Sequence, residues 1–256
     1  SGWDLATIED AGFAPCKMSN LSVCLTSDLF HHYDEGNKLV VVVDILRATS
    51  VISTAFHYGI KDLIAVSSVD TAKQYLNKEN YIVAAERNAE PIEGIPFGNS
   101  PFQYMNEKVK GKTLVLTTTN GTKSIKLAKN HEVICASFVN ENAIVNYILS
   151  SDKDVVILCS GWKGLPNMED SIFAGSLSEK LLNTTEFLAK CDSVLVSISL
   201  WNSSSDNLFD FLENSAHRNR LKHLNMEEDT KFCLSPNFMS DIVPILMGDK
   251  IIPYES

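Results

Sequence analysis

Short apolar runs alternate with helix-like segments along most of the chain. The run KLVVVVD at 38–44 is nearly continuous in valine, which is typical of a strand buried on both faces. The next segment, 47–59, has helical spacing and ends at Gly59, a residue favoured just past a helix. Further strands are expected at 21–29, 61–68, 81–86, 112–119, 132–137 and 154–160, and further helices at 69–79, 122–130, 141–151 and 168–182.

This recurring strand-and-helix unit predicts an α/β fold with a largely parallel sheet and helices on its faces. In such sheets the loops at the carboxyl ends of the strands gather the ligand. These loops follow Val43, Ala85, Leu116 and Leu158 here, and each is rich in polar residues. We therefore expect the functional site at this edge of the sheet.

The last third of the chain is harder to interpret. The β-branched, serine-rich segment 191–204 favours a strand by propensity, whereas 208–225 has helical spacing. The segments 231–236 and 242–253 are interpreted as two closing strands. The chain shows no linker, low-complexity run or short-period repeat.

The composition is that of an ordinary globular protein, with 256 residues of which 45% are hydrophobic and 21% charged. A formal net charge of −10 disfavours nucleic-acid binding unless a local basic patch exists. No apolar run reaches the roughly 20 residues of a membrane helix. Residues 1–17 lack a signal-peptide pattern and Met18 resembles a natural start, so 1–17 are expected to be an added or loose extension.

Cysteine spacing argues against a metal knuckle and against a disulfide framework. No two of the cysteines form a CxxC pair, and several lie inside apolar runs. The six cysteines are at positions 16, 24, 135, 159, 191 and 233. Reduced thiols in a cytoplasmic protein are the simpler interpretation.

The loop TTTNGT at 117–122 crowds hydroxyl groups, an amide and a glycine between a strand and a helix. Its threonine hydroxyls and the first N–H groups of the helix could form a cradle for an anion. Gly121 would let the backbone approach a ligand closely. A turn followed by a helix cap explains the same residues, and taken alone that plainer interpretation is favoured.

The segment VVVDILRATS places Asp44 at the end of a buried strand and Arg47 three residues later. A carboxylate there could bind a hard cation such as Mg²⁺, and a nearby guanidinium could bind phosphate oxygens in a bidentate manner. Asp44 could equally be a helix cap with Arg47 as its surface partner. The sequence leaves both interpretations open.

The segment AAERNAEPIEGIPFGNSP joins a pair of charges, Glu86 and Arg87, to a long loop that ends at Asn99, Ser100 and Pro101. A loop of this length inside a compact domain is usually functional or disordered. Its isoleucines and phenylalanine argue against disorder. A functional loop leading into a helix at Ser100 is therefore favoured.

The segment CSGWKGLPNMEDSIFAG opens a further strand-to-helix loop with Ser160 and Gly161 and starts its helix with Glu169 and Asp170. Acids in a first turn complement the helix dipole, which accounts for one of the two. The other could face the sheet and complete a metal site with Asp44. The histidines at 31, 32 and 57 and the thiol of Cys159 are weaker candidates, and the chain has no P-loop, GxGxxG, GxSxG or HExxH motif.

Taken together and in order, these four segments resemble the 2-phosphosulfolactate phosphatase family over roughly Leu21 to Pro253. The resemblance implies a three-layer α/β/α fold with largely parallel or mixed sheets and two similar lobes, approximately 18–130 and 131–256. It also implies that 191–204 is a helix.

The resemblance further implies a Mg²⁺-dependent hydrolysis of 2-phosphosulfolactate to sulfolactate and phosphate. That step serves coenzyme M synthesis in methanogens, but relatives also occur in bacteria that do not make coenzyme M. The expected partner is a small anionic phosphoester rather than nucleic acid or a membrane, and a homodimer is one possible assembly.

The residues inside the matching motifs are assigned roles on this resemblance. Catalytic roles fall to Asp44, Arg47, Glu86 and Arg87. Substrate-binding roles fall to Asn99, Ser100, Thr119, Asn120, Gly121, Thr122, Ser160 and Gly161. Metal-binding roles fall to Asp44, Glu86, Glu169 and Asp170, with Asp44 first.

The arginines at 47 and 87, with Lys163, would neutralise the anionic substrate. Sequence does not decide whether a carboxylate acts as metal ligand, base or nucleophile. Two alternatives stay open, namely a phosphatase of another small phosphorylated hydroxy acid and a non-catalytic anion-binding protein on the same scaffold. The natural substrate, the number of metal ions and the oligomeric state are not fixed by the sequence.

Overall fold

A single mixed sheet runs through the computed structural model, which describes residues 18–239 and 241–254. Within these residues the sheet has 11 strands in the order β5-β4-β6-β3-β11-β10-β7-β2-β8-β1-β9. The strands are β1 Ser19–Cys24, β2 Leu39–Val43, β3 Asp62–Ala65, β4 Tyr81–Arg87, β5 Glu90–Pro91, β6 Thr113–Thr117, β7 Glu132–Ala136, β8 Val155–Cys159, β9 Phe187–Ala189, β10 Pro244–Met247 and β11 Lys250–Pro253.

Parallel pairing dominates the sheet, as the alternating pattern predicts. β2 lies between β7 and β8 and is parallel to both, with Val40 opposite Val133 and Val156. β3, β4 and β6 form a second parallel set. The antiparallel hairpin of β10 and β11 joins the two sets by pairing with β7 and β3. The predicted α/β fold with a largely parallel, mixed sheet is confirmed.

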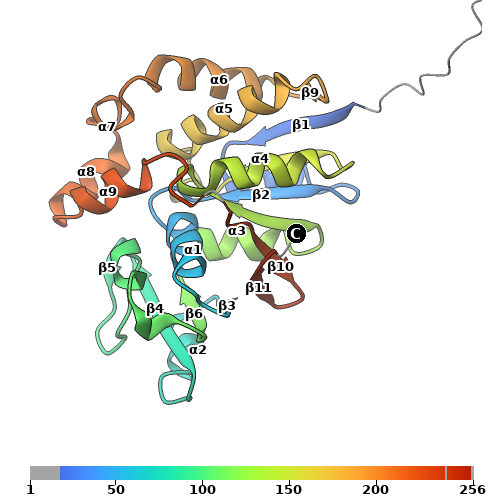
Figure 1. Ribbon diagram of the computed structural model, residues 1–256. Helices are drawn as coiled ribbons and strands as arrows, with labels where there is room; N and C mark the ends of the chain where they lie inside the picture. Colours follow the sequence, from blue (N-terminus) through green and yellow to red (C-terminus); the bar gives the residue numbers. More distant parts are fainter. Residues whose placement is uncertain (1–17, 240, 255–256) are drawn as a thin grey trace, which may run out of the picture.

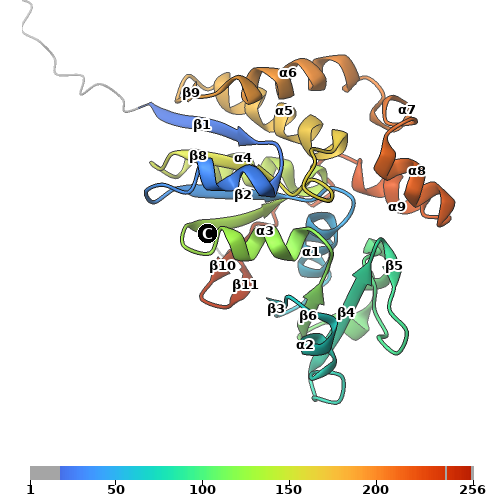
Figure 2. The same cartoon turned by 180° about the vertical axis from the view of Figure 1, so that it is seen from behind.

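Helices cover both faces of the sheet. The α-helices are α1 Ala48–His57, α2 Val69–Lys73, α3 Gly121–Leu127, α4 Glu141–Leu149, α5 Met168–Leu182, α6 Asp192–Ser204, α7 Leu208–Phe211, α8 Ala216–His223 and α9 Glu227–Cys233. Short 3₁₀ turns are at Ser27–His32, Pro101–Tyr104, Glu107–Val109 and Phe138–Asn140. Figures 1 and 2 show α5 and α6 on one side of β1 and β2, with α1 and α3 on the other.

The valine run of β2 explains how the two helical layers are held. Val41 and Val43 point into the hydrophobic cluster that contains α4 and α5, whereas Val40 and Val42 point into the cluster that contains α1 and α3. A strand that is covered by helices on both faces buries every side chain. Its sequence is therefore a continuous run of apolar residues. All five residues of β2 are buried.

The segment 191–204 is a helix, not the strand that its β-branched residues favour. α6 lies against α5 at a very close approach, because a Cβ added to Gly175 would collide with the carbonyl group of Ser197. Small side chains such as Ser197 permit this contact between helices. Tertiary packing has therefore overridden the local strand propensity.

The closing segments also differ from the sequence prediction. Residues 231–233 end α9, and Leu234 is its C-cap, so 231–236 is not a strand. The segment 242–253 contains two strands rather than one, joined through Gly248 in a left-handed conformation with φ of 63°. The helix expected at 69–79 ends at Lys73.

One sheet includes strands from both expected lobes, 18–130 and 131–256. β1 pairs with β8, and β2 pairs with β7. The two-lobed organisation stays a prediction. Residues 1–17, with Cys16, lie outside the described residues. Cysteines 24, 135, 159, 191 and 233 are free thiols.

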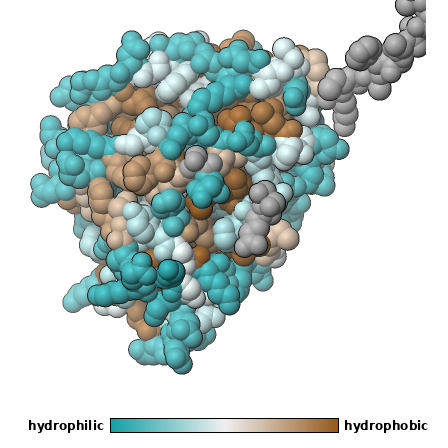
Figure 3. Space-filling view, viewed as in Figure 1, coloured by the Kyte–Doolittle hydropathy of each residue, from teal (hydrophilic) through white to brown (hydrophobic). Residues whose placement is uncertain are grey.

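Two observations concern the surface. Among residues 18–239 and 241–254, no helix combines the length and the apolar character needed to cross a bilayer. On the face shown in Figure 3, hydrophobic areas are interrupted by hydrophilic residues. Leu195 and Val196 of α6 are among the exposed large hydrophobic side chains, at 57% and 56%. A homodimer stays a prediction.

Candidate active site

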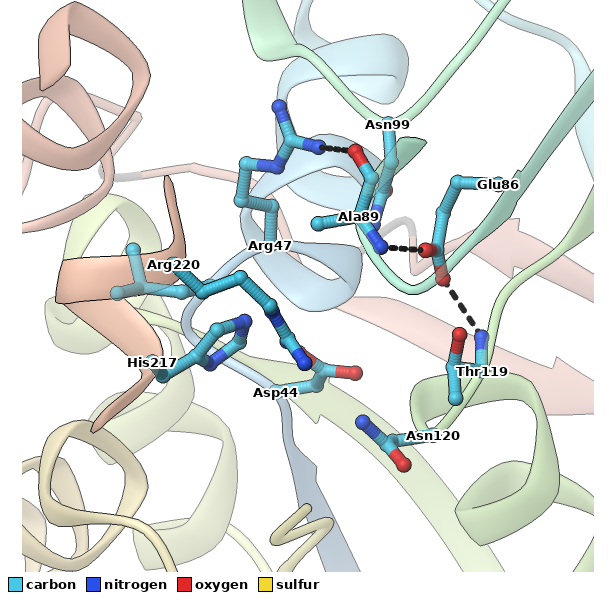
Figure 4. Close-up of a pocket in the computed structure, with 10 residues that line it drawn as sticks. Asp44, Arg47, Glu86, Ala89, Asn99, Thr119, Asn120, His217 and Arg220 are labelled. Atoms are coloured by element: carbon cyan, nitrogen blue, oxygen red, sulfur yellow. Dashed lines mark hydrogen bonds between the residues drawn. The ribbon is translucent and has the colours of Figure 1, made fainter. Parts of the chain in front are cut away.

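A narrow cavity of about 10 Å³ lies where the loops after β2, β4 and β6 meet α8. Figure 4 shows Glu86, Asn99 and Thr119 on one wall, His217 and Arg220 from α8 on the other, and Asp44 between them. The cavity is lined by Asp44, Leu46, Arg47, Glu86, Ala89, Asn99, Thr119, Asn120, His217 and Arg220. Polar and charged groups therefore make up most of the lining.

Asp44 lies at the base of the site, just past β2. Its backbone N–H donates to Thr49 Oγ1 at 3.0 Å, and that hydroxyl donates to the Asp44 carbonyl oxygen at 2.9 Å, which fixes the turn into α1. The side chain is buried, and burial raises its pKa to about 6. His217 opposes this rise, whereas Glu86 and Glu169 add to it.

Gly121 brings the start of α3 directly against Asp44. A Cβ at this position would lie 2.8 Å from Asp44 Oδ2 and 2.6 Å from the Cβ of Ala48. No side chain fits between α1 and α3 here, so the glycine is needed for close approach. This contact sets the position of Thr119 and Asn120 in the cavity wall.

Glu86 joins the loops after β4 and β6. Its Oε2 accepts a hydrogen bond from the Ala89 N–H at 2.7 Å, and its Oε1 accepts one from the Thr119 N–H at 2.6 Å. The carboxylate is buried and also lines the cavity. Glu86 therefore holds the two loops together at the cavity.

Arg47 is held by groups of the protein itself. Its Nη1 donates to Asp229 Oδ2 on α9, and its Nη2 donates to the Ala89 carbonyl oxygen at 3.2 Å. The Ser100 hydroxyl donates to the other oxygen of Asp229 at 3.0 Å. Asp229 thus links α9 to the loops that begin α1 and follow β4.

Asp170 fixes loop geometry rather than facing the cavity. Its Oδ1 accepts from the Ile45 N–H at 2.9 Å and its Oδ2 accepts from the Gly161 N–H at 3.2 Å. Burial, followed by the charges of Asp44 and Glu169, raises its pKa well above the ordinary value. The carboxylate therefore ties the loop after β2 to the loop after β8.

Glu169 is paired with a residue that the sequence analysis did not select. Its Oε1 lies 2.6 Å from Nδ1 of His217, and both side chains are buried. Its other oxygen, Oε2, has no hydrogen-bond partner. This contact orients the His217 imidazole, which lines the cavity beside Asp44.

The donor atoms of the cavity suit a hard cation only in a water-rich arrangement. Among the described residues, no group of at least three His, Cys, Asp or Glu side chains is arranged to hold a metal ion. Mg²⁺ typically takes only one or two carboxylates and keeps several waters. Asp44 and Glu86 line the cavity, and the Oδ1 of Asn99 is buried there without a partner. These oxygen donors fit Mg²⁺.

The sequence as a whole matches a known family. The model of the 2-phosphosulpholactate phosphatase family matches residues 24–249. The chain belongs to this family. A probable 2-phosphosulfolactate phosphatase of Caldanaerobacter subterraneus subsp. tengcongensis is 42% identical over 217 residues, which cover 83% of this chain and 89% of that protein. A protein of the same description from Clostridium novyi is 37% identical over 218 residues, covering 84% of this chain and 92% of that protein. The resemblance noted in the sequence is thereby confirmed, and the family is one of phosphoric monoester hydrolases.

Six of the residues assigned from family motifs line the cavity. They are Asp44, Arg47, Glu86, Asn99, Thr119 and Asn120. These residues are contributed by the segments around β2, β4 and β6, which supports the expectation that the strand-end loops converge.

The remaining assigned residues are not among those that line the cavity. Arg87 donates to the Glu86 carbonyl oxygen at 2.6 Å and to Thr117 Oγ1 at 2.9 Å. Thr122 accepts from and donates to Thr118, which makes much of the TTTNGT loop a self-bonded cap. Ser100, Gly121, Ser160, Gly161, Glu169 and Asp170 likewise are not among the lining residues.

Sequence reasoning missed the wall formed by α8. His217 and Arg220 are three residues apart, which places them on the same face of a helix. That spacing was the available signal. The guanidinium carbon of Arg220 lies 4.1 Å from the ring centroid of Trp162, in the loop after β8. The Nε and Nη1 of Arg220 are buried and have no hydrogen-bond partner.

Proposed function

We propose that this chain is a Mg²⁺-dependent phosphatase that hydrolyses 2-phosphosulfolactate to sulfolactate and phosphate. The observation that carries the proposal is one cavity in which Asp44, Glu86, His217 and two arginines converge, in a member of this family. The described relatives are named probable 2-phosphosulfolactate phosphatases. The free thiols of the chain support a cytoplasmic location for the activity.

The anionic substrate needs concentrated positive charge in a protein whose net charge is −10. Arg47 and Arg220 supply it within the cavity. Asp44 and Glu86, with the side-chain oxygen of Asn99, would hold Mg²⁺. When bound, Mg²⁺ supplies positive charge that neutralises the phosphoryl oxygens during transfer. Asp44 is the first choice for this role because it is buried at the base of the cavity.

His217 is suited to protonate the leaving group. Its Nδ1 is held by Glu169 at 2.6 Å, which fixes the ring and leaves Nε2 for the substrate. In the proposed reaction, water forms a new bond to phosphorus and the ester P–O bond breaks. A proton from His217 Nε2 goes to the departing hydroxyl oxygen of sulfolactate, and the proton lost by the water returns the imidazole to its protonated form.

Phosphate release from 2-phosphosulfolactate tests the proposal. The purified chain should release phosphate in the presence of Mg²⁺, and excess EDTA should abolish that release until Mg²⁺ is restored. Undiminished release in EDTA would remove the metal from the proposal. Absence of release with Mg²⁺ present would remove the activity itself.

The alternative substrates are tested in the same assay. A set of small phosphorylated hydroxy acids should be hydrolysed with lower kcat/KM than 2-phosphosulfolactate. A better substrate within that set would change the proposed natural substrate while leaving the reaction type in place.

A further inference from the structure

Arg220 is a half-buried cation that forms no ion pair within the described residues. Its guanidinium is stacked over the indole ring of Trp162 at 4.1 Å, and its Nε and Nη1 make no hydrogen bond within the described residues. The indole Nε1 of Trp162 is also buried without a partner. Unsatisfied donors of this kind are costly unless a ligand completes them. A planar guanidinium presents several N–H donors, which suits it to hydrogen-bond a carboxylate or a sulfonate.

The other arginine of the cavity is already engaged. Both terminal nitrogens of Arg47 donate to protein groups, Asp229 and the Ala89 carbonyl oxygen. Lys163 lies over the same Trp162 ring at 4.5 Å but is not among the lining residues. Arg220 is therefore the cavity arginine that keeps unpaired donors.

The Arg220 side chain extends from α8 toward Asp44, while its guanidinium carbon lies over the Trp162 ring. Figure 4 shows Glu86 and Thr119 on the wall opposite α8, with Asp44 between the walls. A phosphoryl group beside Asp44 and Glu86 would direct the rest of the substrate across the cavity. The organic part of the ester would then meet α8 and the Trp162 ring.

We propose that Arg220, held on the Trp162 ring, binds the anionic group of the substrate that is not transferred, a sulfonate or a carboxylate. This inference rests on the proposed function, because it assumes that the phosphoryl group lies beside Asp44 and Glu86. It makes Arg220 a determinant of specificity for phosphate esters that carry a second anion. Trp162 is a positioning residue, which acts by holding the guanidinium.

Esters that differ only in the second anion test the assignment. Initial rates are measured with Mg²⁺ for 2-phosphosulfolactate, 2-phospholactate, 2-phosphooxypropane-1-sulfonate and isopropyl phosphate. The third ester keeps only the sulfonate, the second keeps only the carboxylate, and the last keeps neither. In Arg220→Gln, the kcat/KM for 2-phosphosulfolactate relative to isopropyl phosphate should fall by at least about 30-fold.

The two single-anion esters identify the group that Arg220 binds. For each of these esters, the preference is its kcat/KM divided by the kcat/KM for isopropyl phosphate. The ester whose preference is lost in Arg220→Gln carries the anion that Arg220 binds. Arg220→Lys should recover part of the preference, because it keeps the charge but not the two-donor fork. Trp162→Leu should lower the same ratio, and Trp162→Phe should lower it less because an aromatic face remains.

Lys222→Gln is the matched control, because it removes one positive charge from an exposed position on the same helix. Its ratio should stay close to that of the unsubstituted chain. An equal loss on all four esters in Arg220→Gln would mean that Arg220 contacts the transferred phosphate, and would overturn the inference. An unchanged ratio would overturn it as well.

A binding measurement separates this inference from the proposed function. If the unsubstituted chain hydrolyses none of the esters, the proposed function fails. Calorimetric binding of sulfolactate and of 2-propanol, which lacks both anions, then tests Arg220 directly. Sulfolactate binding that does not weaken by at least about 30-fold in Arg220→Gln overturns the subsite.

Discussion

The carboxylate of Glu86 accepts a hydrogen bond from the backbone N–H of Thr119 at 2.6 Å and thereby connects two loops that are 33 residues apart. Its second oxygen accepts from Ala89 at 2.7 Å. In Glu86→Gln, one of these N–H groups would face an amide NH₂ donor instead of an acceptor. We expect a loss of stability of about 2–3 kcal/mol and a fall in kcat/KM of about 100-fold or more.

Chemical denaturation and initial-rate kinetics check this expectation together. Glu90→Gln is the control, because it neutralises an exposed acid in the neighbouring strand β5. If Glu86→Gln behaves like Glu90→Gln in both measurements, the loop-joining role of Glu86 is wrong.

Asp44 makes stability depend on pH in a defined direction. Its pKa rises from 3.8 to about 6 on folding, so the folded chain binds this proton more tightly than the unfolded chain. The associated stabilisation is fully present below about pH 4 and is lost as the pH rises through about 6. Asp44→Asn removes the titration. The stability of the unsubstituted chain relative to Asp44→Asn should therefore fall by about 3 kcal/mol between pH 4 and pH 7.5.

Denaturant unfolding of both chains in EDTA, at several pH values, measures that difference. A difference that stays constant with pH would contradict the raised pKa of Asp44. Adding Mg²⁺ at pH 7.5 should then stabilise the unsubstituted chain more than Asp44→Asn, because a ligand that binds only the folded state stabilises it.

Gly121→Ala should damage the site by crowding. The new Cβ would lie 2.6 Å from the Cβ of Ala48 and 2.8 Å from Asp44 Oδ2. Overpacking of this kind costs about 1–3 kcal/mol. Thermal unfolding measures the loss, and kcat should fall as Asp44 is displaced. The double variant Gly121→Ala with Ala48→Gly removes the shorter contact and should recover part of the stability. Equal melting temperatures for Gly121→Ala and the unsubstituted chain would refute the close approach.

The buried pair of Arg47 and Asp229 should show strong coupling. Removing either partner leaves an uncompensated buried charge, which costs about 3–5 kcal/mol. The double variant Arg47→Met with Asp229→Leu should therefore lose less stability than the sum of the two single variants. A double-mutant cycle in urea measures the coupling.

The exposed pair of Lys231 and Glu228, also on α9, provides the comparison, because surface pairs contribute about 0–1 kcal/mol. A coupling for Arg47 and Asp229 no larger than that of the exposed pair would contradict the buried pairing.

The local sequence pattern was sufficient to predict the wall formed by the loops after β2, β4 and β6. The valine run before Asp44 and the apolar runs before Glu86 and Thr117 place three chemically rich loops at the carboxyl ends of strands. Parallel pairing within the sheet then brings Asp44, Glu86 and Asn120 to a common edge without further information. Six motif residues line the cavity for this reason.

The attachment of α9 beside the site depends on contacts between residues far apart in the sequence. Arg47 and Asp229 are 182 residues apart, and Asp229 looks like any acid in the first turn of a helix. Whether a threonine hydroxyl faces a ligand or bonds within its own loop also depends on the tertiary structure. Thr122 satisfies Thr118 rather than the cavity, although both sit in the motif that suggested an anion cradle. The roles assigned to the motif residues stay predictions.

A space of about 10 Å³ admits a water molecule but not a phosphate ester. We therefore predict that binding and release of a phosphate ester require α8 to separate from the β4–β6 side and then return. Breaking the P–O bond then need not be the slowest step of turnover. Raising solvent viscosity should lower kcat in proportion to the share of the cycle that this opening and closing takes.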